Sequence, residues 1–246
     1  MSCDQTHDVL KHFLIGFNKY WPDCPYDIYI GSNTELYNNK YKYVHVQKTN
    51  WRSETIDQIA GIKKIDDKLT HLIVFLDDFI LKKIVLNNAL NELIKLSFEK
   101  EIKYLRLKKV EEPLLITIFY KIFNSFNFSN IFKIRKNHPY FSSLQVALWD
   151  MDYLDLLVKN CKNIWDFEET NLKKYSHYSV SKSIFSYKHV VEKGKWEFYA
   201  KNYCIKNINY FEQGYRKTQN LNMNRKLYFF LKHIKFLFLG YIKFSK

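Results

Sequence analysis

The chain has 246 residues, of which 47% are apolar and 18% aromatic, so it can bury a large core and is excluded from the disordered class. Its formal net charge is +14, but residues 216–246 hold eight of the 39 Lys and Arg residues and no acid. The other 31 basic residues face 25 acids, which leaves +6 on residues 1–215. A charge argument for nucleic-acid binding therefore applies first to the tail.

Cysteine spacing and the first residues indicate a cellular compartment. The four cysteines are far apart and form neither a CxxC pair nor a zinc-binding spacing with histidine, which predicts free thiols in a reducing cytosol. Residues 1–20 hold acids and histidines instead of a basic start and an apolar core, so we expect no signal peptide. No uninterrupted apolar run reaches the length of a spanning helix. We expect a cytoplasmic protein.

The first third of the chain alternates between helical and extended patterns. In chain order, we expect a helix over 8–21, a strand over 26–30, a strand over 41–47 and a helix over 53–65. Asp8 and Ser53 are the expected helix caps. The apolar run "LIVFL", residues 72–76, is too short for a helix and rich in β-branched side chains, which predicts a buried strand.

Further along, the alternation continues. We expect a helix over 85–100, a strand over 102–107, a helix over 142–160, a shorter helix over 164–175, and a strand, turn and helix start over 183–196. Ser143 is the expected cap of the 142–160 helix, with Trp149 in the core. Its other inward residues are Leu144, Leu148, Tyr153 and Leu156. Strands alternating with helices predict an α/β fold with a mainly parallel sheet and no domain boundary before about residue 210.

Two adjacent carboxylates, Asp77 and Asp78, end the apolar run at 72–76. In open α/β sheets, ligands bind beyond the carboxyl ends of the strands. Two hard oxygen ligands there suit Mg²⁺ or Mn²⁺, with a substrate diphosphate completing the coordination shell. The alternative is a solvated turn, since a second pair, Asp66 and Asp67, lies in an ordinary-looking loop.

The glycine pattern limits the kinds of phosphate-binding site that this sequence can form. The six glycines form neither GxGxxG nor GxxxxGK, so a dinucleotide-binding or P-loop cradle is excluded. A protein of this sequence would handle phosphate with a metal ion and cationic side chains.

Several short pieces, in this order and spacing, resemble one enzyme family. They are "SCDQTHD", "YWPDCPYDIYIGSN", "NW", "VFLDDFIL", "SLQVALWDMDYL", "IWDFEET" and "HVVEKGKW", which together span residues 2 to about 205. The chain resembles bacterial glycosyltransferases of the GT-A fold that build capsule, O-antigen and lipopolysaccharide glycans. The resemblance implies a transferase domain over 1–210, a nucleotide-sugar donor, most readily a UDP-sugar, and a divalent Mn²⁺ or Mg²⁺. The implied acceptor is a hydroxyl of a growing glycan.

The resemblance also implies roles for individual residues on the donor side. Asp77 and Asp78 match the metal-binding DxD-like motif, with Asp78 the stronger metal ligand and Asp77 a candidate to orient ribose or sugar. His189 matches a histidine on the metal or diphosphate; its alternative is a packed strand residue. The remaining donor-side candidates are Cys3 and Asp4 in the nucleotide-binding loop, and Lys193 and Lys195, which could reach the diphosphate or merely flank a solvated turn at Gly194.

On the acceptor side, an inverting transferase needs a carboxylate within hydrogen-bond reach of the acceptor hydroxyl. We expect Glu168 to be this base, with Asp166 as runner-up and Trp165 as a sugar platform beside them. The alternative for Glu168 is an acid favoured by a helix N-terminus. Gln145 matches a position beside the acceptor. Asp150 and Asp152 are nearby alternatives, for which capping or solvated roles fit as well.

One departure from the family concerns its first strand, an apolar segment before "SCD". Only Met1 precedes that piece here. We expect either a start upstream of Met1 or a sheet that lacks one strand.

The tail over 216–246 reads as a basic amphipathic helix. Its apolar stripe consists of Leu227, Phe230, Leu231, Ile234, Leu237, Phe238 and Tyr241. Such a helix can lie in an anionic membrane interface, or dock on the protein core or a second subunit. We expect peripheral contact with the inner face of the cell membrane. Two other classes stay open: a nucleic-acid-binding protein that uses basic and aromatic stretches such as "FKIRKNHPYF", and a transferase-like scaffold without activity.

Overall fold

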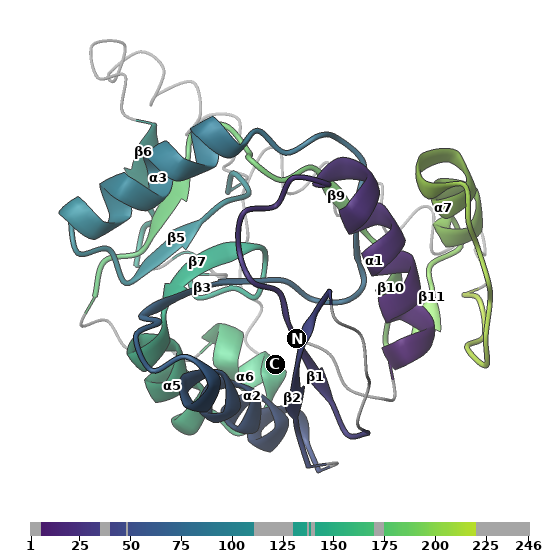
Figure 1. Cartoon of the computed structure of the whole chain (residues 1–246), viewed down its shortest axis with the longest axis horizontal. Helices are drawn as coiled ribbons and strands as arrows, with labels where there is room; N and C mark the ends of the chain where they lie inside the picture. The colour runs from purple at the N-terminus through teal and green to yellow at the C-terminus, as the bar shows by residue number, and fades with distance from the viewer. Residues whose placement is uncertain are drawn as a thin grey trace.

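The computed structural model describes residues 6–34, 40–47, 49–110, 130–136, 138, 141–169 and 175–219. They form a mixed α/β body in which helices cover sheets of mixed strand direction (Figure 1). The helices are α1 (His7–Tyr20), α2 (Trp51–Ile65), α3 (Asn87–Glu99), α5 (Met151–Lys159), α6 (Ile164–Glu169) and α7 (Ala200–Ile208). The strands are β1 (Tyr29–Ser32), β2 (Lys42–His45), β3 (His71–Val74), β4 (Phe79–Leu81), β5 (Tyr104–Arg106), β6 (Ile131–Lys133), β7 (Ala147–Asp150), β8 (Tyr178–Val180), β9 (Tyr187–His189), β10 (Val191–Glu192) and β11 (Lys195–Trp196).

The largest sheet has five strands in the order β3-β7-β5-β8-β6. Only β5 and β8 are parallel; the β3–β7, β7–β5 and β8–β6 pairs are antiparallel. The expectation of a mainly parallel sheet is therefore wrong for the described residues. The physical reason is β7, which runs against both of its neighbours at a place where the sequence predicts only helix.

Residues 142–160 are that place. The structure begins α5 at Met151 and makes Ala147–Asp150 a central strand, all four residues of which are buried. A short apolar run can be a buried strand or a buried helical segment, and periodicity does not separate the two. The expected cap, Ser143, is also wrong: the Asp150 carboxylate accepts the Tyr153 N–H at 2.9 Å. Of the expected inward residues, only Leu156 is wrong, with 43% of its surface exposed.

The early elements follow the sequence pattern closely. Helices α1, α2 and α3 and strands β1, β2, β3 and β5 fall within a few residues of the expected ranges. Two caps differ from expectation, because no side chain caps α1 and because Asn50, not Ser53, caps α2. Asn50 Oδ1 accepts the Ser53 N–H at 3.1 Å, so Asn50, three residues before Ser53, is the N-cap of α2.

Three small strand pairs surround the main sheet. Strands β1 and β2 are parallel, β4 pairs antiparallel with β9, and β10 and β11 form a hairpin. The hairpin turn needs positive φ at two central residues, which Lys193 (φ 50°) and Gly194 (φ 73°) provide. The segment 183–196 therefore contains three strands rather than a strand, a turn and a helix start, and α7 begins four residues later.

The buried side chains form two clusters. One lies under α1 and includes Phe13, Phe17 and Trp196; the other surrounds Trp149, whose side chain is fully buried as expected. His177 belongs to the second cluster region and is also fully buried. Its Nδ1 lies 2.9 Å from the Phe141 carbonyl oxygen and its Nε2 lies 2.7 Å from the Tyr153 hydroxyl. Since a carbonyl only accepts, Nδ1 carries the proton and Nε2 accepts from Tyr153.

His177 predicts a pH-dependent stability. Burial lowers its pKa from 6.5 to about 4, so between these values the unfolded state binds more protons than the folded state. Stability should therefore rise with pH through this window, and fall by about 3 kcal/mol as pH drops from 6.5 to 4. Urea unfolding at a series of pH values measures this slope. His177→Gln should flatten it, whereas replacing the exposed His45 by Gln should not; an unchanged slope in both variants would contradict the prediction.

The last described residues lie against the β10–β11 hairpin. Gln219 N–H donates to the Trp196 carbonyl at 2.8 Å, and the Arg216 guanidinium pairs with Asp8 at 2.9 Å. Residues 216–219 thus pack on the body of the protein, although they were expected to begin the tail. The rest of the tail, with its predicted amphipathic helix, lies outside the described residues. Among the described helices, none combines the length and apolar character required to cross a bilayer.

Candidate functional site

The two adjacent aspartates lie in the turn between β3 and β4. The Phe79 N–H closes this turn on the Leu76 carbonyl at 3.2 Å, and the side chain of Asp78 is only 13% exposed. Asp77 is half-buried as well. This environment differs from that of the second aspartate pair, in which Asp67 is exposed. The first pair is therefore not a solvated turn.

Strand pairing brings His189 to Asp78. Strand β4 pairs with β9 so that Phe79 lies opposite His189, and the Val190 N–H donates to the Asp78 carbonyl at 3.0 Å. His189 Nε2 is then 2.6 Å from Asp78 Oδ2. Burial alone would lower the pKa of His189, but the hydrogen bond and charge of Asp78 outweigh it and raise the pKa. His189 is 47% exposed and is not a packed strand residue.

These two side chains fit a divalent ion in chemical type. Asp78 Oδ1 is buried and receives no hydrogen bond from the described residues, which leaves one carboxylate oxygen for another ligand. An imidazole nitrogen beside a carboxylate suits Mn²⁺ better than Mg²⁺. The described residues contain no group of three or more His, Cys, Asp or Glu side chains around one point. An ion at Asp78 and His189 would take its other ligands from water and a substrate diphosphate.

Tyr187 connects this pair to Gln145. Its ring stacks on Phe79 at 4.4 Å, and its hydroxyl donates to Gln145 Oε1 at 2.5 Å. The Lys108 ammonium lies 4.6 Å from the centre of the same ring and donates to Gln145 Oε1 at 3.4 Å. Burial raises the pKa of Tyr187, so its hydroxyl keeps its proton and stays a donor. The predicted acceptor-side residue Gln145 therefore lies one side chain away from the strand that holds His189.

Glu168 lies on the other side of Gln145, near the end of α6. Glu168 Oε1 accepts the Ser143 hydroxyl at 3.3 Å, and the same hydroxyl oxygen accepts the Gln145 N–H at 3.3 Å. The Leu144 N–H also donates to Glu168. Burial raises the pKa of Glu168, and these two donors oppose that effect only in part. Glu168 is thus a half-buried carboxyl group with a raised proton affinity, not a solvated acid at a helix N-terminus.

Arg106, at the end of β5, links the two carboxylate regions electrostatically. Its positive charge lowers the proton affinity of both Glu168 and Tyr187, so the guanidinium acts electrostatically on both side chains. Arg106 Nε is buried and has no hydrogen-bond partner among the described residues. Sequence reasoning missed Arg106, Lys108 and Tyr187. Only Tyr187 had a usable signal, because it lies two residues before His189 on a strand and so shares its face.

Other candidates lie away from this group. Asp166 Oδ2 accepts the Lys162 N–H at 2.7 Å, which is a structural role at the start of α6. Trp165 is 67% exposed on the same helix. Lys193 and Lys195 are exposed and flank Gly194 in the hairpin turn, which matches the solvated-turn alternative. Cys3 and Asp4 lie outside the described residues. Cys24, Cys161 and Cys204 are free thiols, as expected.

The two aspartates of "LWDMDYL" have structural contacts. Asp150 caps α5 and pairs with Lys103 at 2.7 Å, with only 12% of its side chain exposed. Asp152 is 87% exposed and pairs with Lys63 on α2. Among the described residues, these contacts of Asp150 and Asp152 involve neither Gln145 nor Glu168.

Asp150 is therefore expected to matter for stability and not for turnover. Asp150→Ala removes the cap of α5 and should lower the free energy of unfolding by about 1–2 kcal/mol. The matched variant Asp152→Ala removes an exposed ion pair and should change it by about 0.5 kcal/mol or less. Urea denaturation and the transfer rate under folding conditions measure both effects. A large loss of turnover in folded Asp150→Ala would make it a functional residue instead.

Comparison with known proteins adds no relative: no protein-family model matches the chain, and no curated protein is significantly similar to it.

Proposed function

We propose that this chain is a metal-dependent glycosyltransferase. It would move a sugar from a nucleotide-diphosphate sugar, most readily a UDP-sugar, to a hydroxyl of a growing surface glycan. The observation that carries the proposal is the 2.6 Å pair of Asp78 and His189, built from strands far apart in the sequence, with a half-buried carboxyl group, Glu168, reached through Tyr187 and Gln145. The resemblance of the seven sequence pieces supports the same class.

Each side chain would have a distinct task. Asp78 and His189 would hold Mn²⁺ or Mg²⁺, which when bound supplies positive charge for the departing diphosphate. Arg106 and Lys108 would add positive charge beside Tyr187, which packs on the strand next to Asp78. Glu168 would accept the proton of the acceptor hydroxyl, and its raised pKa makes it a stronger base than an ordinary carboxylate. A base opposite the departing diphosphate gives inversion at the sugar.

The remaining residues stay predictions within this proposal. Gln145 would hydrogen-bond the acceptor, and the exposed ring of Trp165 offers an apolar face to a sugar. Cys3, Asp4 and Asp77 are the candidates for the nucleotide and ribose. Asp166 is a weaker candidate for the base because its carboxylate already accepts a backbone hydrogen bond. Contact with the membrane would come from the predicted amphipathic stripe of the tail, Leu227 to Tyr241, and would bring the enzyme to a lipid-linked acceptor.

The test is thermal unfolding with UDP, GDP, CDP and CMP, each with and without Mn²⁺. A rise in the unfolding temperature with one nucleotide diphosphate, dependent on Mn²⁺, is expected. A gel-shift assay with single-stranded oligonucleotides at physiological salt is the control for the nucleic-acid alternative. Binding of oligonucleotides without any nucleotide effect would overturn the proposal in favour of a nucleic-acid-binding protein. Nucleotide binding without sugar transfer would favour an inactive scaffold.

A further inference from the structure

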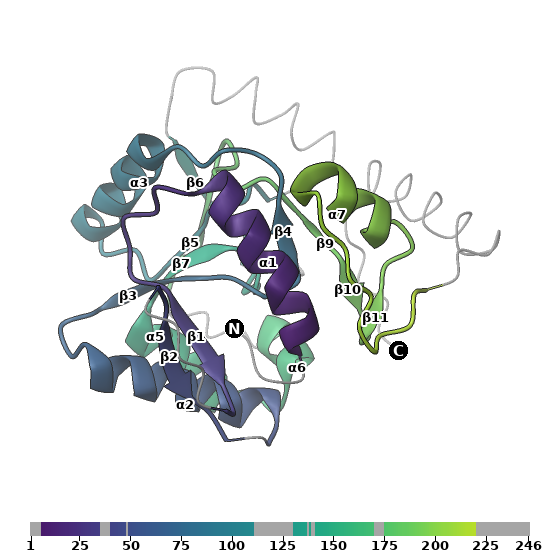
Figure 2. The same cartoon turned by 45° about the vertical axis from the view of Figure 1, so that its right-hand side comes forward.

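A segment after α7 returns to α1 and crosses the β10–β11 hairpin. It consists of residues 209–219, and Figure 2 shows this yellow-green end of the described chain running beside both strands. The Trp196 N–H donates to the Lys217 carbonyl at 3.0 Å, and the indole Nε1 of Trp196 donates to the Gln213 carbonyl at 2.7 Å. We call residues 209–219 the strap, because they contact both the hairpin and α1.

The β10–β11 hairpin takes part of its backbone pairing from the strap. Each of its strands has two residues, and a two-stranded hairpin is only marginally stable by itself in water. Gln219 contacts both strands: its N–H donates to the Trp196 carbonyl at 2.8 Å, and its side-chain amide donates to the Glu192 carbonyl at 3.0 Å. Loss of the strap contacts should therefore loosen the hairpin as well.

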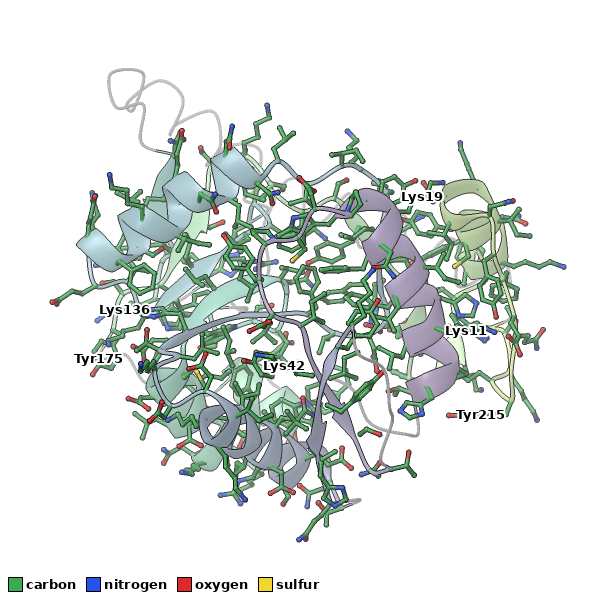
Figure 3. The ribbon with its side chains drawn as sticks, in the orientation of Figure 1. Lys11, Lys19, Lys42, Lys136, Tyr175 and Tyr215 are labelled. Carbon is green, nitrogen blue, oxygen red and sulfur yellow. The ribbon has the colours of Figure 1, made fainter. Side chains whose placement is uncertain are left out.

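Two ion pairs join the strap to α1. Lys11, which Figure 3 labels on α1, pairs with Glu212 at 3.0 Å, but both side chains are largely exposed, so this pair contributes little to stability. The second pair joins Arg216 to Asp8 at 2.9 Å, with only 8% and 11% of the side chains exposed. Gly214 permits this close approach, because it has a φ of 60° and a Cβ atom there would lie 3.1 Å from the Cβ of Asp8.

His12, on α1, lies under the strap and is fully buried. Its Nδ1 lies 2.8 Å from the Asp8 carbonyl oxygen, and the Glu212 N–H donates to its Nε2 at 3.0 Å. A carbonyl only accepts and an amide N–H only donates, so both partners require a neutral imidazole with its proton on Nδ1. The rings of Trp196, from the hairpin, and Tyr210, from the strap, pack against the imidazole with ring centres 5.0 and 4.9 Å away. The neutral form of His12 therefore joins all three elements.

Protonation of His12 would oppose this arrangement. A second proton, on Nε2, would point at the Glu212 N–H, so two donors would face each other where one hydrogen bond now lies. Burial lowers the pKa of His12; the hydrogen bond to the Asp8 carbonyl and the charges of Asp8 and Glu212 act against burial, whereas the charge of Lys11 acts with it. The closed strap therefore binds fewer protons than the open one, and its closure weakens as pH falls below about 6.5.

The charged side chains of the strap that face α1 keep their charge in the same pH range. Hydrogen bonds from Tyr210 and Lys11 lower the pKa of Glu212, so its pair with Lys11 persists at pH 5.5. Hydrogen bonds to Tyr210 and Glu212 raise the pKa of Lys11. The guanidinium of Arg216 stays charged throughout. A change in the strap between pH 7.5 and 5.5 would thus report on His12.

We propose that residues 209–219 form a pH-sensitive strap, which neutral His12 holds against α1 and the hairpin and which opens when the imidazole binds a proton. Opening would loosen β10 and β11, while β9 would stay paired with β4. It would also free the segment from which the basic tail continues. The proposal rests on the contacts of His12 and does not depend on the function proposed above.

The first test is hydrogen exchange of the 246-residue chain at pH 7.5 and 5.5, followed by mass spectrometry and corrected for the effect of pH on the exchange chemistry itself. Protection of peptides over 209–219 and 191–196 should fall by about tenfold at the lower pH, because an opening linked to one proton changes by up to tenfold per pH unit. The strap should also exchange faster than β7 at both pH values, as a local opening requires. Unchanged protection of the strap would overturn the proposal, and so would protection equal to that of β7 throughout.

The second test assigns the effect to His12. In His12→Gln, the side-chain amide can still accept the Glu212 N–H but does not titrate, so the pH dependence of exchange in the strap should disappear. His177→Gln is the matched control, because it removes another buried histidine that lies in the other core cluster region and should leave the pH dependence of the strap intact. A pH dependence that persists in His12→Gln, or that disappears in His177→Gln, would show that His12 does not control the strap.

Discussion

Replacing Asp78 by alanine is expected to abolish Mn²⁺-dependent nucleotide binding and to reduce sugar transfer by about 100-fold or more. The physical reason is that the variant removes the buried carboxylate that both pairs with His189 and keeps one oxygen open. Thermal unfolding with the nucleotide panel and a donor-hydrolysis assay measure the two effects. The fold should persist, because strands β4 and β9 keep their backbone pairing.

The chain contains a matched control for this variant. Asp67 is the second residue of the other aspartate pair and is exposed. Asp67→Ala should leave binding and transfer at the level of the unmodified protein. If Asp78→Ala binds nucleotide and Mn²⁺ as tightly as Asp67→Ala, the metal assignment of Asp78 is wrong.

Glu168→Gln is expected to reduce transfer by about 10²–10⁴-fold while nucleotide binding stays intact. The amide keeps the shape of the side chain and can still accept the Ser143 hydroxyl, but it cannot take a proton from the acceptor. In the unmodified protein, the raised pKa of Glu168 implies that transfer declines on the acid side at a pH above the usual range for a glutamate. A pH–rate profile and single-turnover kinetics provide the measurement.

The same substitution has a stability consequence with a defined sign. Because the pKa of Glu168 is raised in the folded state, the folded state binds more protons than the unfolded state between the two values, so stability falls as pH rises through them. Glu168→Gln should therefore unfold at a higher temperature than the unmodified protein at pH 7, and the difference should close toward pH 4. Asp166→Asn is the matched control on the same helix. Full turnover in Glu168→Gln, with loss in Asp166→Asn, would exchange their roles.

The sequence predicted helices and outer strands better than it predicted the central sheet. Amphipathic helices such as α2 and α3 carry a periodic signal over several turns, so they fall close to the expected ranges. Strand β7 carries no such signal, because Ala147–Asp150 is buried on both faces and reads as part of the following helix. Because β7 was not predicted, its antiparallel pairing with β3 and β5 could not be predicted either, since strand direction depends on which segments become neighbours in space.

For the site, the sequence indicated residue types but not their partners. Asp78 and His189 were both candidates, yet their contact depends on the register of β4 against β9. Glu168 and Gln145 are likewise joined by the Ser143 hydroxyl, which was expected to cap a helix. Arg106 and Lys108 sit in an ordinary strand end, where nothing in a single sequence distinguishes them from solvated cations.

The pairing of β4 with β9 also limits where the chain can tolerate an inserted or deleted residue. Each strand has three residues, and Phe79 opposite His189 sets the face on which the imidazole projects. Because side chains alternate along a strand, inserting or deleting one codon between Ser186 and His189 would turn the imidazole away from Asp78. Insertion scanning should thus find this stretch intolerant even to single alanines, whereas the exposed loop at Asp67 and Lys68 should accept them. The number of residues in β9 would then be as tightly constrained as the identity of His189.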